Sequence, residues 1–305
     1  MRRKGERIDG VLLLDKPYGE TSNAALQKAR RLFNAAKAGH TGTLDPLASG
    51  LLALTFGEAT KFSADLLHAD KTYIAEVKLG QTTTTGDLEG EFLTHVPVEV
   101  TEADLERVLA DFRGEIEQIP PMFSALKRDG KTLYDLAREG MSIELEPRRV
   151  RIEKLQCLSF NGESVTLEVT CSKGTYIRVL AEDIGRALGC GAHLTGLRRT
   201  KVGDLTIESS VTLQDLEAMN HEQRLQTLLP LDALMQTLPA VYLSQNDCDR
   251  LQNGQRLALA LECRGRVRVY GPDKMMVGTA RVNDRGVLAP ERLIANKKDI
   301  ETKND

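Results

Sequence analysis

Residues 39–50, with the sequence GHTGTLDPLASG, place a single carboxylate on a stiff backbone. The glycines can adopt positive φ, whereas Pro46 fixes its own φ and keeps Asp45 out of the α region. Leu44 and Leu47 flank the acid, and we expect them to anchor the loop in a core. Asp-Pro and Gly-rich clusters also occur in ordinary turns. A turn alone does not require a histidine, two threonines and an anchored acid, so this segment is our candidate reactive loop.

A second segment, residues 172–178 with the sequence SKGTYIR, carries an arginine where a predicted strand turns through glycine into a helix. A carboxylate that takes part in chemistry must be ionised, and a nearby cation lowers its pKa. Arg178 is our candidate for the cation that acts on Asp45. The alternative is a surface pair between Arg178 and Glu182 at i,i+4, which the spacing alone favours.

A tyrosine and a histidine complete the candidate side chains. Tyr73 lies in a strand predicted for residues 71–79, where a lone tyrosine is most often a packing residue with its hydroxyl in water. His40 precedes Asp45 by five residues, and a lone histidine is usually structural. We predict no metal site, because His40 and Asp45 lack two further ligands at a suitable spacing.

Residues 39–50 closely resemble the catalytic motif of the TruB-type pseudouridine synthases, and the resemblance extends from about residue 8 to residue 293. It implies isomerisation of a uridine at position 55 in the T loop of tRNA, with the base flipped out and no cofactor. It also implies that Asp45 is the essential catalytic residue, that Arg178 pairs with it, and that Tyr176 lines the pocket. Whether Asp45 attacks carbon as a nucleophile or removes a proton as a base stays open.

The same resemblance implies roles for further residues. Tyr73 would stack on the flipped base and is the proposed acceptor of the C5 proton. A phenol normally titrates near 10, so that second role requires a depressed pKa or is minor. His40 would contact the backbone of the extruded nucleotide, and Leu197, in a third motif, would pack against the base. Lys16 belongs to a Lys-Pro element that supports the site, and Asp87 matches an acidic position of unassigned role.

The order of the predicted elements indicates an α+β fold. Strands and helices mix without a strict βαβ repeat, which favours a largely antiparallel mixed sheet flanked by helices over a doubly wound one. We assign this catalytic domain to residues 8–238. The predicted elements are strands at 11–14, 51–56 and 71–79, helices at 23–33, 59–67, from Thr101 onward and at 176–188, a hairpin around Asn161–Gly162, extended chain at 193–207 and two short helices within 213–228.

The pattern changes near residue 239. Short strands cut by glycines predict a small all-β barrel over residues 239–296, similar to the RNA-binding PUA domain. Residues 297–305 are predicted to be a flexible tail.

Basic side chains gather in residues 121–149, which correspond to the thumb-like insertion of the family. Lys127, Arg128 and Lys131 are the predicted RNA-binding residues, and Arg198 and Arg199 are expected to extend the basic surface. Phosphate contacts of this kind position an RNA, whereas its loop shape and splayed bases give specificity. The alternative is an amphipathic helix with a solvated charged face.

Composition limits the partners and the compartment. The net charge of −3 argues mildly against a general nucleic-acid binder, so only local clusters support RNA binding. The five cysteines are an odd number without a C-x-x-C pair, which predicts reduced thiols in a cytoplasmic protein. No apolar run is long enough for a signal or a membrane span. We expect a monomer that acts on the T arm of tRNA without a guide RNA or a protein complex.

Two other classes of function stay open. A nucleoside or glycoside hydrolase needs paired acids across the sugar, for which Glu58 or Asp87 would have to join Asp45. Aromatic residues make up only 4% of the chain, which disfavours a sugar-stacking cleft. The other class is a non-catalytic RNA-binding or tRNA-folding protein, based on the basic segment and the barrel.

Overall fold

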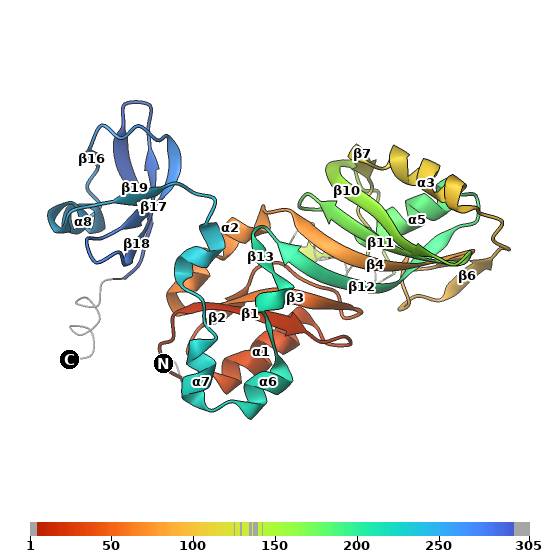
Figure 1. Ribbon diagram of the computed structural model, residues 1–305, viewed down its shortest axis with the longest axis horizontal. Coiled ribbons are helices and arrows are strands. Elements are labelled where there is room, and N and C mark those ends of the chain that lie inside the picture. The colour runs from red at the N-terminus through yellow and green to blue at the C-terminus, as the bar shows by residue number, and fades with distance from the viewer. Residues whose placement is uncertain are drawn as a thin grey trace.

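The computed structural model describes residues 5–295, except residues 125, 129, 134–135, 137–139 and 142. For Lys127, Arg128, Lys131 and Thr132 the description covers the backbone but not the side chains. Two sheets dominate this part of the chain, one of ten strands and one of five. Figure 1 shows the five-stranded sheet beside one end of the larger one. The predicted α+β class is confirmed.

The large sheet has the order β14-β1-β3-β12-β4-β11-β10-β7, with β13 beside β12 and β2 beside β3. Neighbouring strands are antiparallel except in the pairs β1–β14 and β3–β12. The sheet is therefore mixed and largely antiparallel, as predicted. Its strands are β1 Gly10–Lys16, β2 Ala38–His40, β3 Ala48–Phe56, β4 Lys71–Leu79, β7 Gly114–Gln118, β10 Arg148–Phe160, β11 Ser164–Cys171, β12 Ala192–Val202, β13 Leu205–Thr206 and β14 Val211–Thr212.

Helical segments cover the large sheet and close three apolar cores against it. The helix α1 begins after Thr21, whose hydroxyl accepts from the N–H of Ala24 at 3.1 Å, as the cap residue predicted. The expected helix over 59–67 is divided into a 3-10 turn and a short α-helix. The helical segments are α1 Ser22–Leu32, η1 Gly57–Lys61, α2 Ser63–Leu67, α3 Glu102–Asp111, α5 Ile177–Ala187, η2 Ile207–Ser209, α6 Leu213–Ala218, α7 His221–Gln226 and η3 Leu231–Met235.

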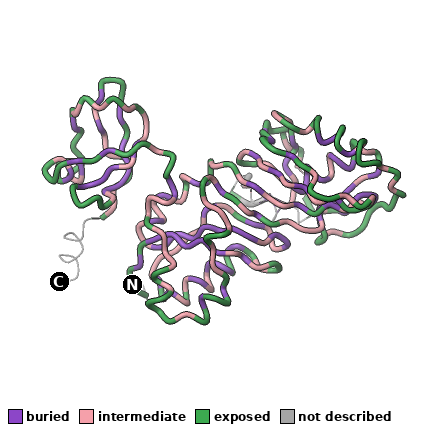
Figure 2. The backbone as a smooth tube through the Cα atoms, in the orientation of Figure 1, coloured by how far each residue is buried: buried purple, intermediate pink, exposed green. Residues whose placement is uncertain are grey.

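One of these cores packs η1, α2 and η3 against β1 and β3. The other two lie at different ends of the large sheet. One packs α1 and α6 against β1 and β3, and the other packs α3 and α5 against β4, β11 and β12. Tyr73 and Leu197 contact both cores, so they mark the place where the two meet. Figure 2 shows the buried strand segments concentrated along the middle of this sheet. Two small hairpins lie outside it, β5 Gln81–Thr83 with β6 Phe92–His95 and β8 Lys127–Arg128 with β9 Lys131–Thr132.

The C-terminal sheet has the order β15-β17-β18-β19-β16 and its own apolar core. Its strands are β15 Ala240–Tyr242, β16 Leu257–Ala258, β17 Gly265–Tyr270, β18 Met276–Val282 and β19 Val287–Leu293. The helix α8, Gln245–Gln252, was not expected from the sequence, although Ser244 caps it by accepting from the N–H of Asp247 at 3.2 Å. The sheet is tied to the main body by Arg266, which pairs with Asp65.

Close approach of β3 and β12 depends on one glycine. Gly50 has φ +100°, and a Cβ at this position would lie 2.3 Å from the carbonyl oxygen of Arg199 on the neighbouring strand. A side chain there would force the two strands apart. Because β3 follows the loop that carries Asp45, this contact also fixes where that loop ends.

We expect Gly50→Ala to lower the free energy of unfolding by about 2 kcal/mol more than Gly162→Ala, because only the first substitution adds overpacking to left-handed strain. Gly162 is the matched control, since it has φ +91° but no atom within 4 Å of an added Cβ. Urea unfolding of both variants measures the difference. Equal losses would show that strand approach at Gly50 is not the constraint.

Candidate active site

The loop that carries Asp45 is held from both sides, as its two leucines predicted. Leu44 and Leu47 are 4% and 3% exposed and lie in different cores, one on each side of the acid. Ser22 binds Leu44 twice, because its hydroxyl accepts from the Leu44 N–H at 2.8 Å and donates to the Leu44 carbonyl at 2.9 Å. The N–H of Ala48 donates to the Asp45 carbonyl at 3.0 Å. The carboxylate itself stays 44% exposed, so it is fixed but accessible.

Arg178 joins three segments at this loop. Its Nη2 lies 3.1 Å from Asp45 Oδ2, and its Nη1 lies 3.3 Å from Asp87 Oδ2. The same two nitrogens donate to the carbonyl oxygens of Phe123 at 2.9 Å and Thr85 at 3.3 Å. The Arg178 side chain is only 7% exposed, so the interpretation as a surface pair with Glu182 is wrong.

The fork is positioned by the first turn of α5 and by the loop that holds Asp87. Tyr176 precedes α5, and its N–H donates to Gln118 Oε1 at 3.1 Å, while Gln118 Nε2 donates to the Tyr176 carbonyl at 3.3 Å. The Asp87 side chain is 2% exposed and accepts from the N–H of Glu89 at 3.0 Å. Asp87 therefore supplies a second, buried carboxylate to Arg178. The sequence singled out its acidic type but not this contact.

Lys16 lies beside the loop with its ammonium group directed at backbone oxygens. It is fully buried, and Nζ donates to the carbonyls of Pro17 at 2.8 Å and Glu20 at 2.6 Å. Burial lowers the pKa of Lys16 to about 8, although the charges of Glu20 and Asp45 act in the opposite direction. The electrostatic contact with Asp45 places Lys16 at the site, where the Lys-Pro element was expected.

Tyr73 is half-buried between the two cores, and burial raises the pKa of its phenol. The depressed pKa that would suit a base is therefore not found. The charge of Arg199 acts against the effect of burial, whereas that of Asp45 adds to it. Leu197 is half-buried and packs in the same two cores.

His40 ends β2 and pairs with Leu54 of β3. Its Nδ1 is buried and has no hydrogen-bond partner in the described part of the chain. Burial lowers the pKa of His40, as does the charge of Arg199, whereas a backbone contact with Gly42 raises it. The end of β2 therefore holds the His40 ring at the start of the loop that carries Asp45.

Arg199 corrects the prediction of a basic surface. Its exposed fraction is 1%, and Nε donates to the carbonyl of Leu51 at 2.8 Å. It is therefore a buried residue whose charge reaches Lys16, His40 and Tyr73. Sequence reasoning missed this because an Arg-Arg pair in a strand does not reveal which side chain points inward, although alternation of faces along β12 requires one to do so. Arg198 is the exposed member.

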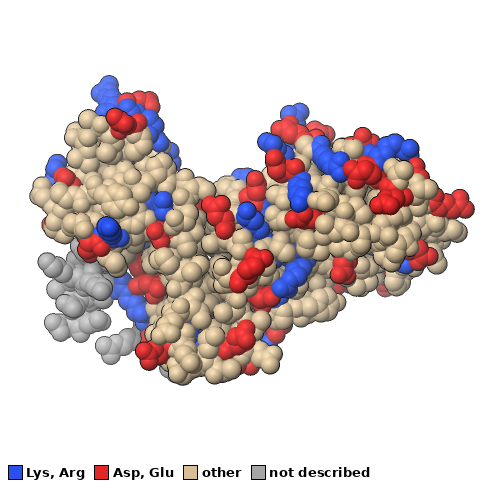
Figure 3. Space-filling view, viewed as in Figure 1, with Lys and Arg blue, Asp and Glu red and all other residues tan. Residues whose placement is uncertain are grey.

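The predicted RNA-contacting side chains of Lys127, Arg128 and Lys131 lie outside the described residues, and only their backbone is placed, in the hairpin β8–β9. On the face drawn in Figure 3, Lys and Arg side chains are intermixed with Asp and Glu. Next to this segment, the exposed Arg151 is likewise close to an acid, since its Nη2 lies 2.7 Å from Glu153 Oε2.

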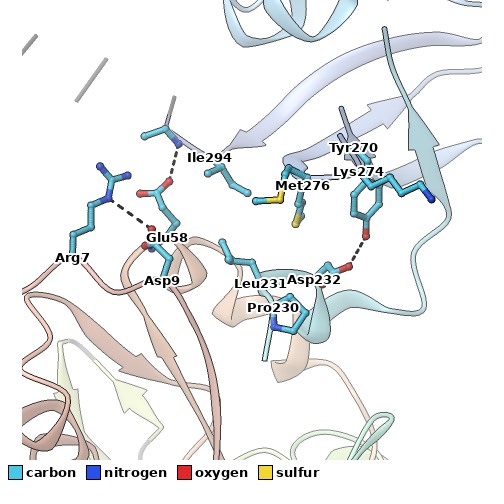
Figure 4. A pocket seen from close by; sticks show the side chains of 12 residues that line it. Arg7, Asp9, Glu58, Pro230, Leu231, Asp232, Tyr270, Lys274, Met276 and Ile294 are labelled. Atoms are coloured by element: carbon cyan, nitrogen blue, oxygen red, sulfur yellow. Dashed lines mark hydrogen bonds and ion pairs between the residues drawn. The ribbon is translucent and has the colours of Figure 1, made fainter. Parts of the chain in front are cut away.

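A cavity of about 700 Å³ lies between the C-terminal sheet and the main body, away from the Asp45 loop. Figure 4 shows Leu231, Met276 and Ile294 on its apolar side and the hydrogen bond from Tyr270 to Asp232 across from them. None of the predicted site residues lines it. Within residues 5–295 and their stated gaps, no group of three His, Cys, Asp or Glu side chains is arranged for a metal ion. No helix among the described residues is long and apolar enough to cross a membrane.

The comparisons with known proteins cover nearly the whole chain. Residues 30–177 match the model of the TruB family pseudouridylate synthase N-terminal domain. Residues 178–236 match the tRNA pseudouridylate synthase B C-terminal domain, and residues 239–294 match the C-terminal model of pseudouridine synthase II TruB.

Similar curated proteins carry the name tRNA pseudouridine synthase B. One from Dechloromonas aromatica is 55% identical over 96% of this chain and 98% of its own length. One from Burkholderia mallei is 58% identical over 94% of this chain and 97% of its own. Among solved structures, a chain of a Cbf5-Nop10-Gar1 complex is 27% identical, with a TM-score of 0.74 over 95% of this chain and 86% of that chain. A chain of an H/ACA RNP bound to a substrate RNA containing 2′-deoxyuridine is 25% identical, with a TM-score of 0.73 over 97% of this chain and 92% of that chain.

We expect the stability that Lys16 contributes to rise with pH between about 8 and 10.5, because the folded protein releases this proton before the unfolded chain does. The difference in unfolding free energy between wild type and Lys16→Met should grow in favour of wild type by about 2 kcal/mol over that range. Denaturant unfolding at several pH values measures it. Lys154→Met is the exposed control, and a difference for Lys16→Met that does not change with pH would contradict the prediction.

Proposed function

Because the chain belongs to the TruB family of pseudouridylate synthases, we propose that it converts uridine 55 in the T loop of tRNA to pseudouridine. The observation that carries the proposal is the half-exposed Asp45 carboxylate paired with the buried Arg178. The reaction breaks the bond between N1 and C1′, turns the uracil and joins C5 to C1′. It requires an ionised carboxylate at the sugar or ring, a closed place for the detached base and an acceptor for the C5 proton.

The two carboxylates at Arg178 take different tasks. Asp45 is accessible and acts on the substrate, as nucleophile or as base. Asp87 is buried and cannot reach a substrate, so it balances the charge of the guanidinium and holds it in place. Removing one partner of such a buried arrangement leaves an uncompensated charge, which typically costs several kcal/mol.

The base pocket is formed where the two cores of the large sheet meet. Tyr73 and Leu197 reach this place from neighbouring strands and are the surfaces on which the flipped uracil packs. Tyr176 lines the pocket from the start of α5, and His40 contacts the nucleotide backbone from the end of β2. Extruding a base costs a few kcal/mol, which such stacking and edge contacts offset.

RNA binding is assigned to two parts of the chain. The thumb-like residues 121–149 supply Lys127, Arg128 and Lys131 for phosphate contacts, and the segment is attached to the site because Phe123 accepts from Arg178. Residues 239–296 form the PUA-like domain. We further propose that residues 8–238 form the catalytic domain, followed after the PUA-like part by the tail 297–305.

The protein would act on the T arm as a cytoplasmic monomer, without a guide RNA or protein complex. The match to curated relatives named tRNA pseudouridine synthase B, which covers 96% and 94% of this chain, supports an action on tRNA.

The alternative classes receive less support. A hydrolase needs a second acid across the sugar. Asp87 is buried against Arg178, and Glu58 lies in the distant cavity, where it pairs with Lys61 at 2.6 Å. A non-catalytic RNA-binding protein would not need the fixed, accessible acid at Asp45.

We expect Asp45→Asn to abolish turnover and to leave tRNA binding largely intact, since amide and carboxylate are nearly isosteric. The measurement is tritium release from tRNA labelled at uridine C5, followed by mapping of the pseudouridine to position 55. Asp183→Asn, which removes an acid paired with Arg186 on the same helix, is the matched control and should keep wild-type release.

Wild-type turnover by Asp45→Asn would contradict the assignment of the acid. Release of free uracil by the wild-type protein would favour the hydrolase. Tight binding without any tritium release by the wild-type protein would favour the non-catalytic RNA-binding class.

A further inference from the structure

Arg199 is a buried cation for which the described residues provide no acid. It is 1% exposed, and its Nη2 has no hydrogen-bond partner in the described part of the chain, where it also forms no ion pair. Its Nε is fixed on the carbonyl of Leu51 at 2.8 Å. A buried charge without a partner costs several kcal/mol. A group that can become anionic next to Arg199 would therefore be stabilised by it.

The pairing of residues across neighbouring strands identifies the group that can become anionic next to Arg199. Lys16 on β1 pairs with Gly50 on β3, Gly50 pairs with Arg199 on β12, and Arg199 pairs with Tyr73 on β4. Residues opposite each other on neighbouring strands share a face, with Cβ atoms about 5 Å apart. Gly50 has no side chain and Lys16 is a cation, so Tyr73 is the member of this row that can carry a negative charge.

The groups around the Tyr73 phenol shift its pKa in opposite directions. Burial is the largest influence and raises the pKa of Tyr73, and the charge of Arg199 on β12 is the largest influence that lowers it. Cys171 on β11 and Asp45 in the reactive loop both raise it. Arg199 is thus the charged group that counteracts the effect of burial on the pKa of Tyr73. Its position is fixed by the contact of Nε with the Leu51 carbonyl.

We propose that Arg199 is a positioning residue for Tyr73, holding the phenol in the cross-strand row and stabilising the phenolate that takes the proton from uracil C5. The inference rests on the proposed function and adds to it the group that opposes the burial of the phenol and favours its phenolate form. Arg199 does not contact the substrate and acts through the tyrosine.

The proton step balances without a further reactant except water. After C5 has joined C1′, the phenolate oxygen of Tyr73 takes the C5 proton. The electron pair of the C5–H bond forms the double bond between C5 and C6. The π pair between C6 and N1 moves to N1, which takes a proton from water, and the phenol later returns its proton to the solvent.

The test compares single-turnover rates at saturating enzyme on tRNA that carries either hydrogen or deuterium at uridine C5. In Arg199→Met, an apolar side chain of similar length replaces the cation. We expect the rate to fall about 100-fold, the usual contribution of a general base. The deuterium isotope effect should become larger than in wild type, because C5 deprotonation becomes rate-limiting, and the dissociation constant for tRNA should not change.

Arg199→Lys should restore part of the rate, since an ammonium group also stabilises a phenolate, and it provides the same comparison if Arg199→Met does not fold. The matched control is Arg224→Met, because Arg224 is a half-buried guanidinium that donates to the carbonyls of Leu216 and Leu32 far from the site. That variant should lose stability and keep the wild-type rate and isotope effect.

An unchanged rate in Arg199→Met, or a slower one without a larger isotope effect, would overturn the inference. So would a weaker tRNA complex that reacts at the wild-type rate once saturated, because Arg199 would then serve binding. In all these cases an active wild-type protein leaves the proposed function standing. A wild-type protein that forms no pseudouridine would overturn both.

Discussion

The site depends on the guanidinium of Arg178, which binds Asp45, Asp87 and two backbone carbonyls at once. These partners come from three segments of the chain, because Thr85 and Asp87 share one loop, and none of these segments is placed by a helix or strand alone. A planar group with donors in a fixed fork can hold several such segments in one geometry, which an ammonium group cannot. The accessible carboxylate is therefore positioned by its contact with this guanidinium.

The large sheet makes that contact possible by bringing distant segments together near its middle. Asp45 precedes β3, Tyr73 lies on β4 and Leu197 on β12, and these three strands are neighbours in the order β3-β12-β4. Gly50 lets β3 and β12 approach closely, so the side chains of the row lie between two cores rather than over one. A pocket at the junction of two cores has apolar walls for a base and polar backbone at its rim.

The fold class, most elements and the buried leucines of the candidate reactive loop could be predicted from the sequence, because local signals determine them. Thr21 and the hairpin at Asn161–Gly162 are examples, and their caps and turns follow from residue type alone. Arg199 and Asp87 could not be placed in the same way. Their roles depend on strand register and on burial between segments far apart in the chain, and a surface pair explained Arg178 equally well until its burial was known.

The distribution of charge explains how a chain of net charge −3 can act on a polyanion. Lys16, Arg178 and Arg199 are all buried around a single accessible acid, where the low dielectric strengthens each interaction. Surface charges are screened within about 10 Å at ordinary salt, so the global sum has little effect at this distance. Buried cations behind apolar walls instead favour any negative charge that develops on the base, the tyrosine or the acid. This local excess of positive charge depends on strand register and burial, so it cannot be inferred from composition or isoelectric point.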